Sequence, residues 1–221
     1  MLNDNWLKYN SPINYPLVTG TSTLAVSLAD TKDWLKIPST LTVDNNLITA
    51  LIKASTSFFE KITGRDLITK TYKCYLDNFP SNDAPAYYAG ISSLLPKYQD
   101  NGIYLRKSPL QSITSIQYYK EGVLTTWDAS NYYSTVSTNY SAIYVVDGKE
   151  FPKDVDFRKQ AIIITFTAGF GASDANIPED IKQAVLRFIS FLYDNRGDCA
   201  DKDKQSAALF YFTPFKIIQD V

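Results

Sequence analysis

The chain has 221 residues, 45% of them hydrophobic, and a formal net charge of −1, so it is long and apolar enough for one domain or two small ones around a real core. The near-neutral charge excludes a general attraction to nucleic acids or acidic membranes. The complete absence of histidine excludes the commonest general base and the commonest metal ligand.

Cysteine content and hydropathy indicate the compartment. The two cysteines, Cys74 and Cys199, are far apart in a chain of this length, which is not the pattern of a disulfide framework. No apolar run approaches the length of a membrane span, and the N-terminus lacks the basic region and apolar core of a signal peptide. We therefore expect reduced thiols in a cytosolic setting.

Residues 1–26 are predicted to form an extended arm. They carry only two charges, Asp4 and Lys8, and include the aromatic side chains of Trp6 and Tyr9. A disordered tail is usually more charged and less aromatic. We expect the arm to lie on a surface of its own chain or of a neighbour, with a floppy terminus as the alternative.

The first two predicted helices each begin with a capping residue. Ser27 begins the helix at 27–37, and an acid three residues later completes a sequence similar to a capping box. Asp44 is the expected N-cap of the second helix, at 44–63, and Gly64 is placed to end it.

The third predicted helix, at 178–196, has two apolar lines. The broad line has helical spacing and consists of Ile181, Ala184, Val185, Phe188, Ile189 and Leu192. Phe188 is expected to face Phe58 of the second helix across the bundle. The narrower line is Leu186 and Tyr193, which indicates either a central helix in its own bundle or a contact with a neighbouring subunit.

Residues 66–170, between the second and third helices, have the alternation and turn signals of a β-rich part. Strands are predicted at 66–79, 103–107, 113–120, 123–127, 132–138, 142–146 and from Ala161 onward. Glu121-Gly122 is typical of a hairpin turn. The predicted fold class is α+β, a small antiparallel helical bundle with a β-rich insert between the second and third long helices.

A long loop is predicted at 80–101. It holds three prolines and the pair Tyr87 and Tyr88. Long loops in compact domains are usually functional or disordered, and tyrosine is enriched at protein interfaces. We predict that this loop contacts another protein subunit.

The C-terminal segment, 198–221, is predicted to dock on another protein. Its apolar side chains crowd together near the chain end and include Phe210, Tyr211, Phe212, Phe215 and Ile217. A terminus this apolar is not expected to stay in water. The alternative is that it folds back onto its own bundle.

No group of residues indicates catalysis. Gly169 and Gly171 precede a helix, but Asp174 occupies the place of the third glycine of a phosphate-binding loop. Asp154 and Asp156 have no clear further acidic partners, so a solvated turn is favoured over a cation site. We predict no catalytic, cofactor-binding or metal-binding residue, and a chain that is not an enzyme.

The order of the motifs resembles that of the tailed-phage head–tail connector, or adaptor, family. The motifs are SLADTKDWL, DNNLITALIKASTSFFEKITGRDLITKTYKCYLDNFP, a strand ending in Ser-Pro-Leu, SITSIQYY, ITFTAGFG, IPEDIKQAVLRFISFLYDNRG and FTPFKII. They cover residues 27–79 and 103–218. The arm at 1–26 and the loop at 80–101 are longer than the core of that family needs.

The resemblance implies a structural protein of the virion neck, present in the host cytoplasm during assembly, with a connector domain at 27–197. Subunits would form a closed ring, twelve copies matching the portal, and DNA would pass through its lumen without being read. The partners would be the portal protein, other copies of the chain and a stopper or tail protein, with no membrane and no cofactor. The alternatives are a stopper or tail terminator and, less favoured, a small enzyme.

The resemblance implies that the C-terminal segment docks on the portal or an adjacent subunit, whereas the contacts of the arm, the loop and the narrower line of the third helix are expected from their own apolar and aromatic residues. The expected portal or subunit interface comprises Phe210, Tyr211, Phe212, Phe215, Ile217, Leu186 and Tyr193. The expected interface with a neighbour or the next neck protein comprises Tyr87, Tyr88, Trp6 and Tyr9.

Overall fold

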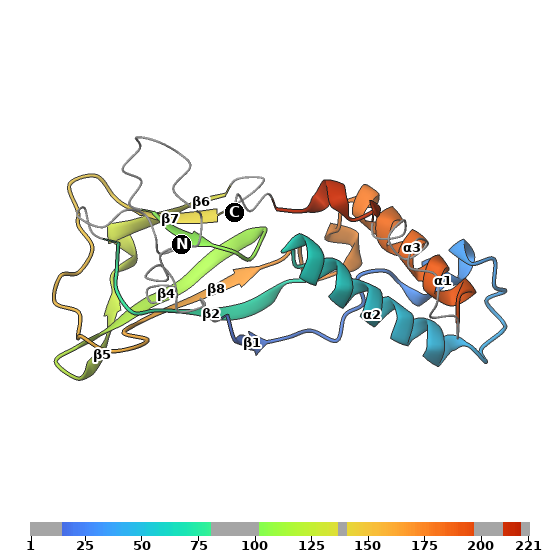
Figure 1. Ribbon diagram of the computed structural model, residues 1–221, viewed down its shortest axis with the longest axis horizontal. Helices are drawn as coiled ribbons and strands as arrows, with labels where there is room; N and C mark the ends of the chain where they lie inside the picture. The colour runs from blue at the N-terminus through green and yellow to red at the C-terminus, as the bar shows by residue number, and fades with distance from the viewer. Residues whose placement is uncertain (1–14, 81–101, 137–140, 197–209, 218–221) are drawn as a thin grey trace, which may run out of the picture. The chain divides into compact units, whose positions relative to one another are not determined.

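A computed structural model describes residues 15–80, 102–136, 141–196 and 210–217, and these form two compact units (Figure 1). The α unit contains the described residues of 21–69 and 169–217. The β unit contains those of 15–20 and 70–168. Each unit has its own hydrophobic core.

The helices of the α unit begin and end close to where the sequence predicts. They are α1 (Leu28–Trp34), α2 (Asn45–Thr63) and α3 (Glu179–Asp194). The Ser27 hydroxyl accepts a hydrogen bond from the backbone N–H of Asp30 at 3.0 Å, which confirms the predicted N-terminal cap. Gly64 ends α2 with a φ of 75°, a conformation that favours glycine.

Aromatic rings fill the centre of the α unit. Phe58 of α2 and Phe188 of α3 stack with their centroids 5.3 Å apart and their planes 6° from parallel, which confirms that they face each other. Phe212 packs edge to face with Phe188 and with Phe59, with ring centroids 5.0 and 5.1 Å apart. Such pairs contribute about 0.5–1.5 kcal/mol beyond the area they bury.

The larger sheet of the β unit has five antiparallel strands. Their order is β1 (Leu17–Thr19), β2 (Lys70–Leu76), β8 (Ile162–Ala168), β4 (Leu110–Lys120) and β5 (Val123–Trp127). Strand β8 is central, with Ile164 opposite Cys74 on one side and Ile116 on the other. These three side chains are buried, so β-branched residues at alternate positions of β8 form the middle of this core.

The smaller sheet has three antiparallel strands in the order β3 (Ile103–Leu105), β7 (Ser141–Val145) and β6 (Tyr132–Val136). Its buried residues belong to the same core as those of the larger sheet. Trp127 of β5 and Tyr132 of β6 join the two, with ring centroids 5.1 Å apart.

The predicted fold class is wrong. In the described ranges, three α-helices accompany two antiparallel sheets with eight strands, so the fold is mostly β-rich and is not a helical bundle with an insert. Residues 17–19, ahead of every helix, pair with β2 and belong to the larger sheet. The physical reason is that the sheets bury a second, independent core of their own, in which Ile162, Ile164 and Phe166 are fully buried.

Several local predictions also need correction. Asp44 precedes α2 but makes no side-chain cap, because its carboxylate binds elsewhere. The strand predicted at 66–79 is the shorter β2, and the strand predicted at 113–120 begins earlier, at Leu110. The hairpin turn is confirmed, since Glu121 and Gly122 have φ values of 52° and 78°, as a two-residue turn of this kind requires.

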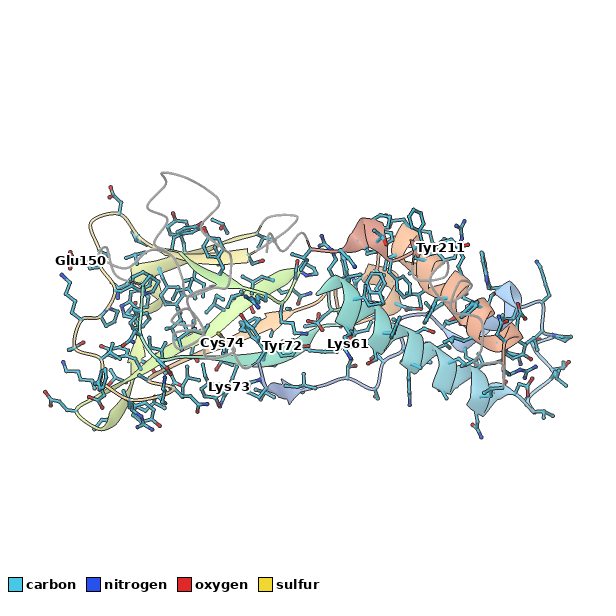
Figure 2. The ribbon with its side chains drawn as sticks, viewed as in Figure 1. Lys61, Tyr72, Lys73, Cys74, Glu150 and Tyr211 are labelled. Atoms are coloured by element: carbon cyan, nitrogen blue, oxygen red, sulfur yellow. The ribbon has the colours of Figure 1, made fainter. Side chains whose placement is uncertain are left out.

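The Cys74 thiol lies in the core of the β unit, on β2 (Figure 2). Burial raises its pKa to about 12, so the thiol stays protonated at neutral pH. We expect native protein at a pH below the ordinary thiol pKa of about 8.5 to resist iodoacetamide at this position and unfolded protein to be alkylated. Peptide mass spectrometry measures this, and rapid labelling of the native thiol would contradict the packing of β2 against β8.

Candidate interaction surfaces

The described part of the C-terminal segment, residues 210–217, packs against α2 and α3 of its own α unit. The Arg65 guanidinium donates through Nε to the carbonyl oxygen of Phe215 at 2.7 Å. The backbone N–H of Ile217 donates to the carbonyl oxygen of Thr63 at 2.9 Å. A short 3₁₀ helix, η5 (Thr213–Phe215), has Pro214 in its first turn, where a missing backbone N–H leaves no hydrogen bond unmade.

This segment has one inward and one outward side. Phe212 is fully buried between α2 and α3, which is the alternative that the sequence left open. Phe210 is 71% exposed and Tyr211 is 39% exposed, with the Arg187 guanidinium 5.2 Å from the Tyr211 ring (Figure 2). Phe215 and Ile217 are half-buried. Phe210 and Tyr211 are therefore the aromatic side chains of the segment that a partner can reach in the folded monomer.

The narrower apolar line of α3, Leu186 and Tyr193, makes its contacts within its own chain. Leu186 is 5% exposed. The Tyr193 hydroxyl donates to Oδ2 of Asp44 at 2.7 Å, and this hydrogen bond raises the pKa of Tyr193. The Arg196 guanidinium lies 4.1 Å from the Tyr193 ring centroid and 3.8 Å from the Asp44 carboxylate. These contacts tie the end of α3 to the start of α2.

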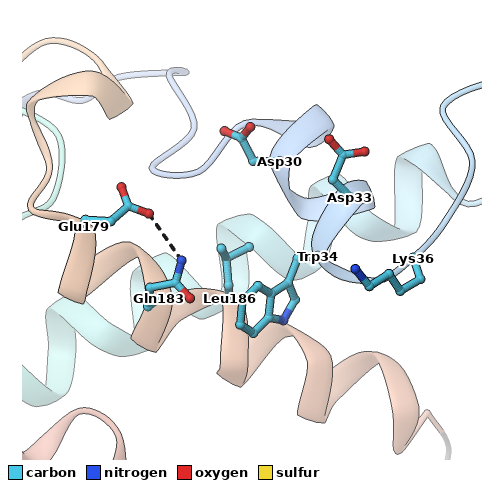
Figure 3. Close-up of a pocket in the computed structure, with 7 residues that line it drawn as sticks. All are labelled: Asp30, Asp33, Trp34, Lys36, Glu179, Gln183 and Leu186. Carbon is cyan, nitrogen blue, oxygen red and sulfur yellow. Dashed lines mark hydrogen bonds between the residues drawn. The ribbon is translucent and has the colours of Figure 1, made fainter.

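A hollow of about 530 Å³ opens between α1 and α3 (Figure 3). Its lining residues are Asp30, Asp33, Trp34, Lys36, Glu179, Gln183 and Leu186. The indole N–H of Trp34 donates to the Ser190 hydroxyl at 2.8 Å, which holds the ring over α3 beside Leu186. The lining includes three carboxylates, from Asp30, Asp33 and Glu179, and one ammonium group, from Lys36, so the hollow is acidic.

A turn ahead of β8 presents Phe157 to solvent. This side chain is fully exposed and lies between two charged residues, Asp156 and Arg158. The sequence interpretation missed this residue. The only signal in the sequence was one large apolar side chain among charged neighbours. Hydrophobic periodicity gives no information about a single residue of this kind.

Lys32 is buried and organises the loop between α1 and α2. Its ammonium group donates to the carbonyl oxygens of Ser39 and Leu41, at 3.0 and 2.6 Å, and to Oδ1 of Asn45 at 3.2 Å. The loop consequently holds a fixed shape in which Val43 is 85% exposed.

Replacing Lys32 with methionine should lower the free energy of unfolding by about 1–3 kcal/mol, because it removes the three hydrogen bonds of a buried ammonium group to the loop while keeping most of the side-chain volume. Denaturant unfolding monitored by circular dichroism measures the loss. The control is Lys53→Met on the exposed side of α2, which should change stability by less than about 0.5 kcal/mol. Equal effects of the two substitutions would contradict the organising role of Lys32.

The four remaining predicted interface residues, Trp6, Tyr9, Tyr87 and Tyr88, lie outside the described residues. Their assignment to a neighbour or the next neck protein therefore stays a prediction.

The residues weighed for chemistry have structural partners. Asp154 pairs with Lys120 at 2.6 Å, and Asp156 accepts backbone hydrogen bonds from Glu121 and Gly122. Across the described ranges, no three Cys, Asp or Glu side chains are grouped to hold a metal ion. Within the same ranges, no helix combines the length and apolarity needed to span a membrane.

Solved structures share this fold. A chain from the "Neck of empty GTA particle computed with C6 symmetry" is 20% identical, with a TM-score of 0.72 over 95% of this chain and 98% of that chain. A chain from the "Virion of native gene transfer agent (GTA) particle" is 20% identical, with a TM-score of 0.71 over 94% and 97%. A chain from the "Neck of native GTA particle computed with C12 symmetry" is 19% identical, with a TM-score of 0.68 over 95% and 98%.

No curated protein matches the chain. A protein-family model described as "Head completion protein" matches residues 25–204. That match spans most of the chain and agrees with the order of motifs in the sequence. The protein therefore belongs to the head completion protein family and is a structural protein of the virion.

Proposed function

We propose that this protein forms a ring in the virion neck that joins the portal vertex to the tail or stopper. The observation that carries the proposal is family membership together with a fold shared, over nearly the whole length of both chains, with chains from the necks of gene transfer agent particles. The proposed ring has twelve copies, a number compatible with both symmetries under which the related necks were computed, C12 and C6. Subunits pack head-to-tail, since a closed ring of this kind requires two different complementary surfaces on each copy.

DNA passes through the lumen of the proposed ring without being read. A net charge of −1 supports this role, because a strongly basic lumen would bind the phosphates of the passing duplex and retard it. Asp154 and Asp156 are each bonded to neighbouring groups of the same chain, which fits a structural rather than an enzymatic protein.

The outward side of the C-terminal segment contacts the portal in this proposal. Phe210 and Tyr211 are exposed on a segment that is itself fixed by Arg65 and by the buried ring of Phe212. Binding through a fixed segment costs little ordering entropy, and exposed aromatic anchors carry most of the energy of many interfaces. Trp6, Tyr9, Tyr87 and Tyr88 are proposed to contact a neighbour or the next neck protein.

Negative-stain microscopy of the protein mixed with its portal tests the function. We expect an added tier on the portal, with the symmetry of that tier giving the copy number. A tier on isolated tails and none on portals would instead identify a tail terminator, and would overturn the proposal.

Replacing Phe210 and Tyr211 together with serine should weaken portal binding by more than about tenfold for each side chain, because aromatic anchors contribute about 2 kcal/mol or more. Their exposure predicts a nearly unchanged melting temperature. Val43→Ser, at another exposed apolar position of the α unit, is the control and should leave binding intact. If the double variant binds the portal as the wild type does, the portal surface lies elsewhere on the chain.

A further inference from the structure

The turn that carries Phe157 is held rigidly on both sides. The backbone N–H of Arg158 donates to the carbonyl oxygen of Asp156 at 2.9 Å, which places Phe157 at the apex of a three-residue turn. On one side, both Asp156 carboxylate oxygens accept hydrogen bonds at 2.8 Å, from the backbone N–H groups of Glu121 and Gly122.

The other side of the turn is attached to two strands. The Arg158 guanidinium stacks 3.8 Å from the ring centroid of Tyr119, at the end of β4. Asp77, just after β2, accepts from the Lys159 ammonium group at 2.7 Å and from the backbone N–H of Gln160 at 2.8 Å. This many contacts around a fully exposed phenylalanine form a preorganised anchor, because little conformational freedom remains to be lost on binding.

The hollow between α1 and α3 has complementary chemistry. Trp34 is 37% exposed and supplies an aromatic wall, and its polar N–H is already bonded to Ser190. Asp30 and Glu179 reach toward the opening from the two helices (Figure 3). An apolar group flanked by a cation suits this combination of an aromatic wall and a carboxylate rim.

We infer that the Phe157 turn of one copy inserts into the α1–α3 hollow of the next copy. This inference rests on the proposed ring, whose closure requires a projecting surface and a different receiving surface on every subunit. Phe157 packs against Trp34 and Leu186, and the Arg158 guanidinium binds the carboxylates at the rim. Because the rim of the hollow is negatively charged, it favours the Phe157 turn with its Arg158 guanidinium over an apolar group that carries no positive charge.

Cysteine cross-linking tests the contact directly. Lys159→Cys, which keeps Phe157 and Arg158 and lies at a side chain that is 80% exposed, is combined with Gln183→Cys in a chain in which Cys199 is serine, and rings formed alone or on the portal are treated with a short bifunctional maleimide. We expect a ladder of covalent multimers, since each copy offers both thiols to different neighbours. Gln183 lines the hollow, whereas Lys53 is exposed on α2 outside it, so Lys159→Cys with Lys53→Cys is the matched control and should give no ladder.

Charge exchange tests the polar half of the contact. Arg158→Glu and Asp30→Lys should each reduce ring assembly at least tenfold, and the two substitutions in one chain should restore it. Melting of each monomer separates an assembly defect from misfolding, and Phe157→Ser provides a further variant at a fully exposed side chain.

The outcomes separate this inference from the function on which it rests. Rings that form without a ladder, or that tolerate Phe157→Ser, overturn the inference and leave the proposed function standing. Absence of any ring from the wild-type protein, both alone and on the portal, overturns both. A ladder together with restored assembly in the exchanged variant supports the contact.

Discussion

Replacing Phe188 with alanine is expected to lower the free energy of unfolding of the α unit by about 3–5 kcal/mol. The ring is 4% exposed, stacks against Phe58 and packs edge to face with Phe212. Removing it leaves a cavity among other large rings, which cannot relax into the space without losing their own contacts. Denaturant unfolding followed by far-ultraviolet circular dichroism, which reports on the helices, measures the loss.

The control for Phe188 is Val43→Ala, at a side chain that is 85% exposed. It should change the same free energy by less than about 0.5 kcal/mol. A Phe188→Ala protein with the stability of the wild type would show that α2, α3 and Phe212 do not share the aromatic core described above.

Replacing Gly169 with alanine is expected to lower the free energy of unfolding by about 3 kcal/mol or more, because backbone strain and a steric clash occur at the same residue. The φ of Gly169 is +134°, which side chains of L-residues rarely adopt. A Cβ here would also lie 2.6 Å from Cα of Thr69 and 2.7 Å from the carbonyl carbon and oxygen of Ile68, all backbone atoms that cannot move aside. Thermal unfolding and expression level both report the loss.

Gly148 provides a matched control for Gly169. Its φ is +74°, but a Cβ at this position meets nothing within 4 Å. Gly148→Ala should therefore lower the free energy of unfolding only by the cost of a positive φ in a residue with a Cβ, about 1–2 kcal/mol. Equal losses at the two positions would mean that the close approach of Gly169 to the neighbouring backbone contributes nothing.

Local signals predicted local structure well. A stripe at helical spacing with a terminal glycine gives α2 nearly residue for residue, and Glu121-Gly122 gives the hairpin between β4 and β5. These features depend on residues that are neighbours in sequence, so each can be interpreted without knowledge of the rest of the chain.

Pairing between distant segments defeated the prediction of the fold class. Residues 17–19 form a strand only because β2 offers a free edge, and three residues are too few for alternation to mark them. The same limit applies to Asp44. Its position suggests an N-cap, but its carboxylate accepts a hydrogen bond from the Tyr193 hydroxyl of α3. Local capping rules cannot anticipate a competing partner 149 residues away.

Hydrophobicity alone also could not assign the interaction surfaces. It marks Phe210, Tyr211 and Phe212 equally, although the structure buries the last and exposes the first two. Phe157 shows the reverse difficulty, since its charged neighbours give no reason to single it out until their hydrogen bonds are known.

The buried position of Phe212 has a consequence for synthesis on the ribosome. The α unit combines residues 21–69 with residues 169–217, so its two halves are translated far apart in time. Its core is complete only when Phe212, which is fully buried there, has left the exit tunnel. A chain whose translation stops before this residue lacks the ring, and the helices of such a fragment cannot close their core. Such a fragment therefore supplies no stable α unit to the ring proposed above.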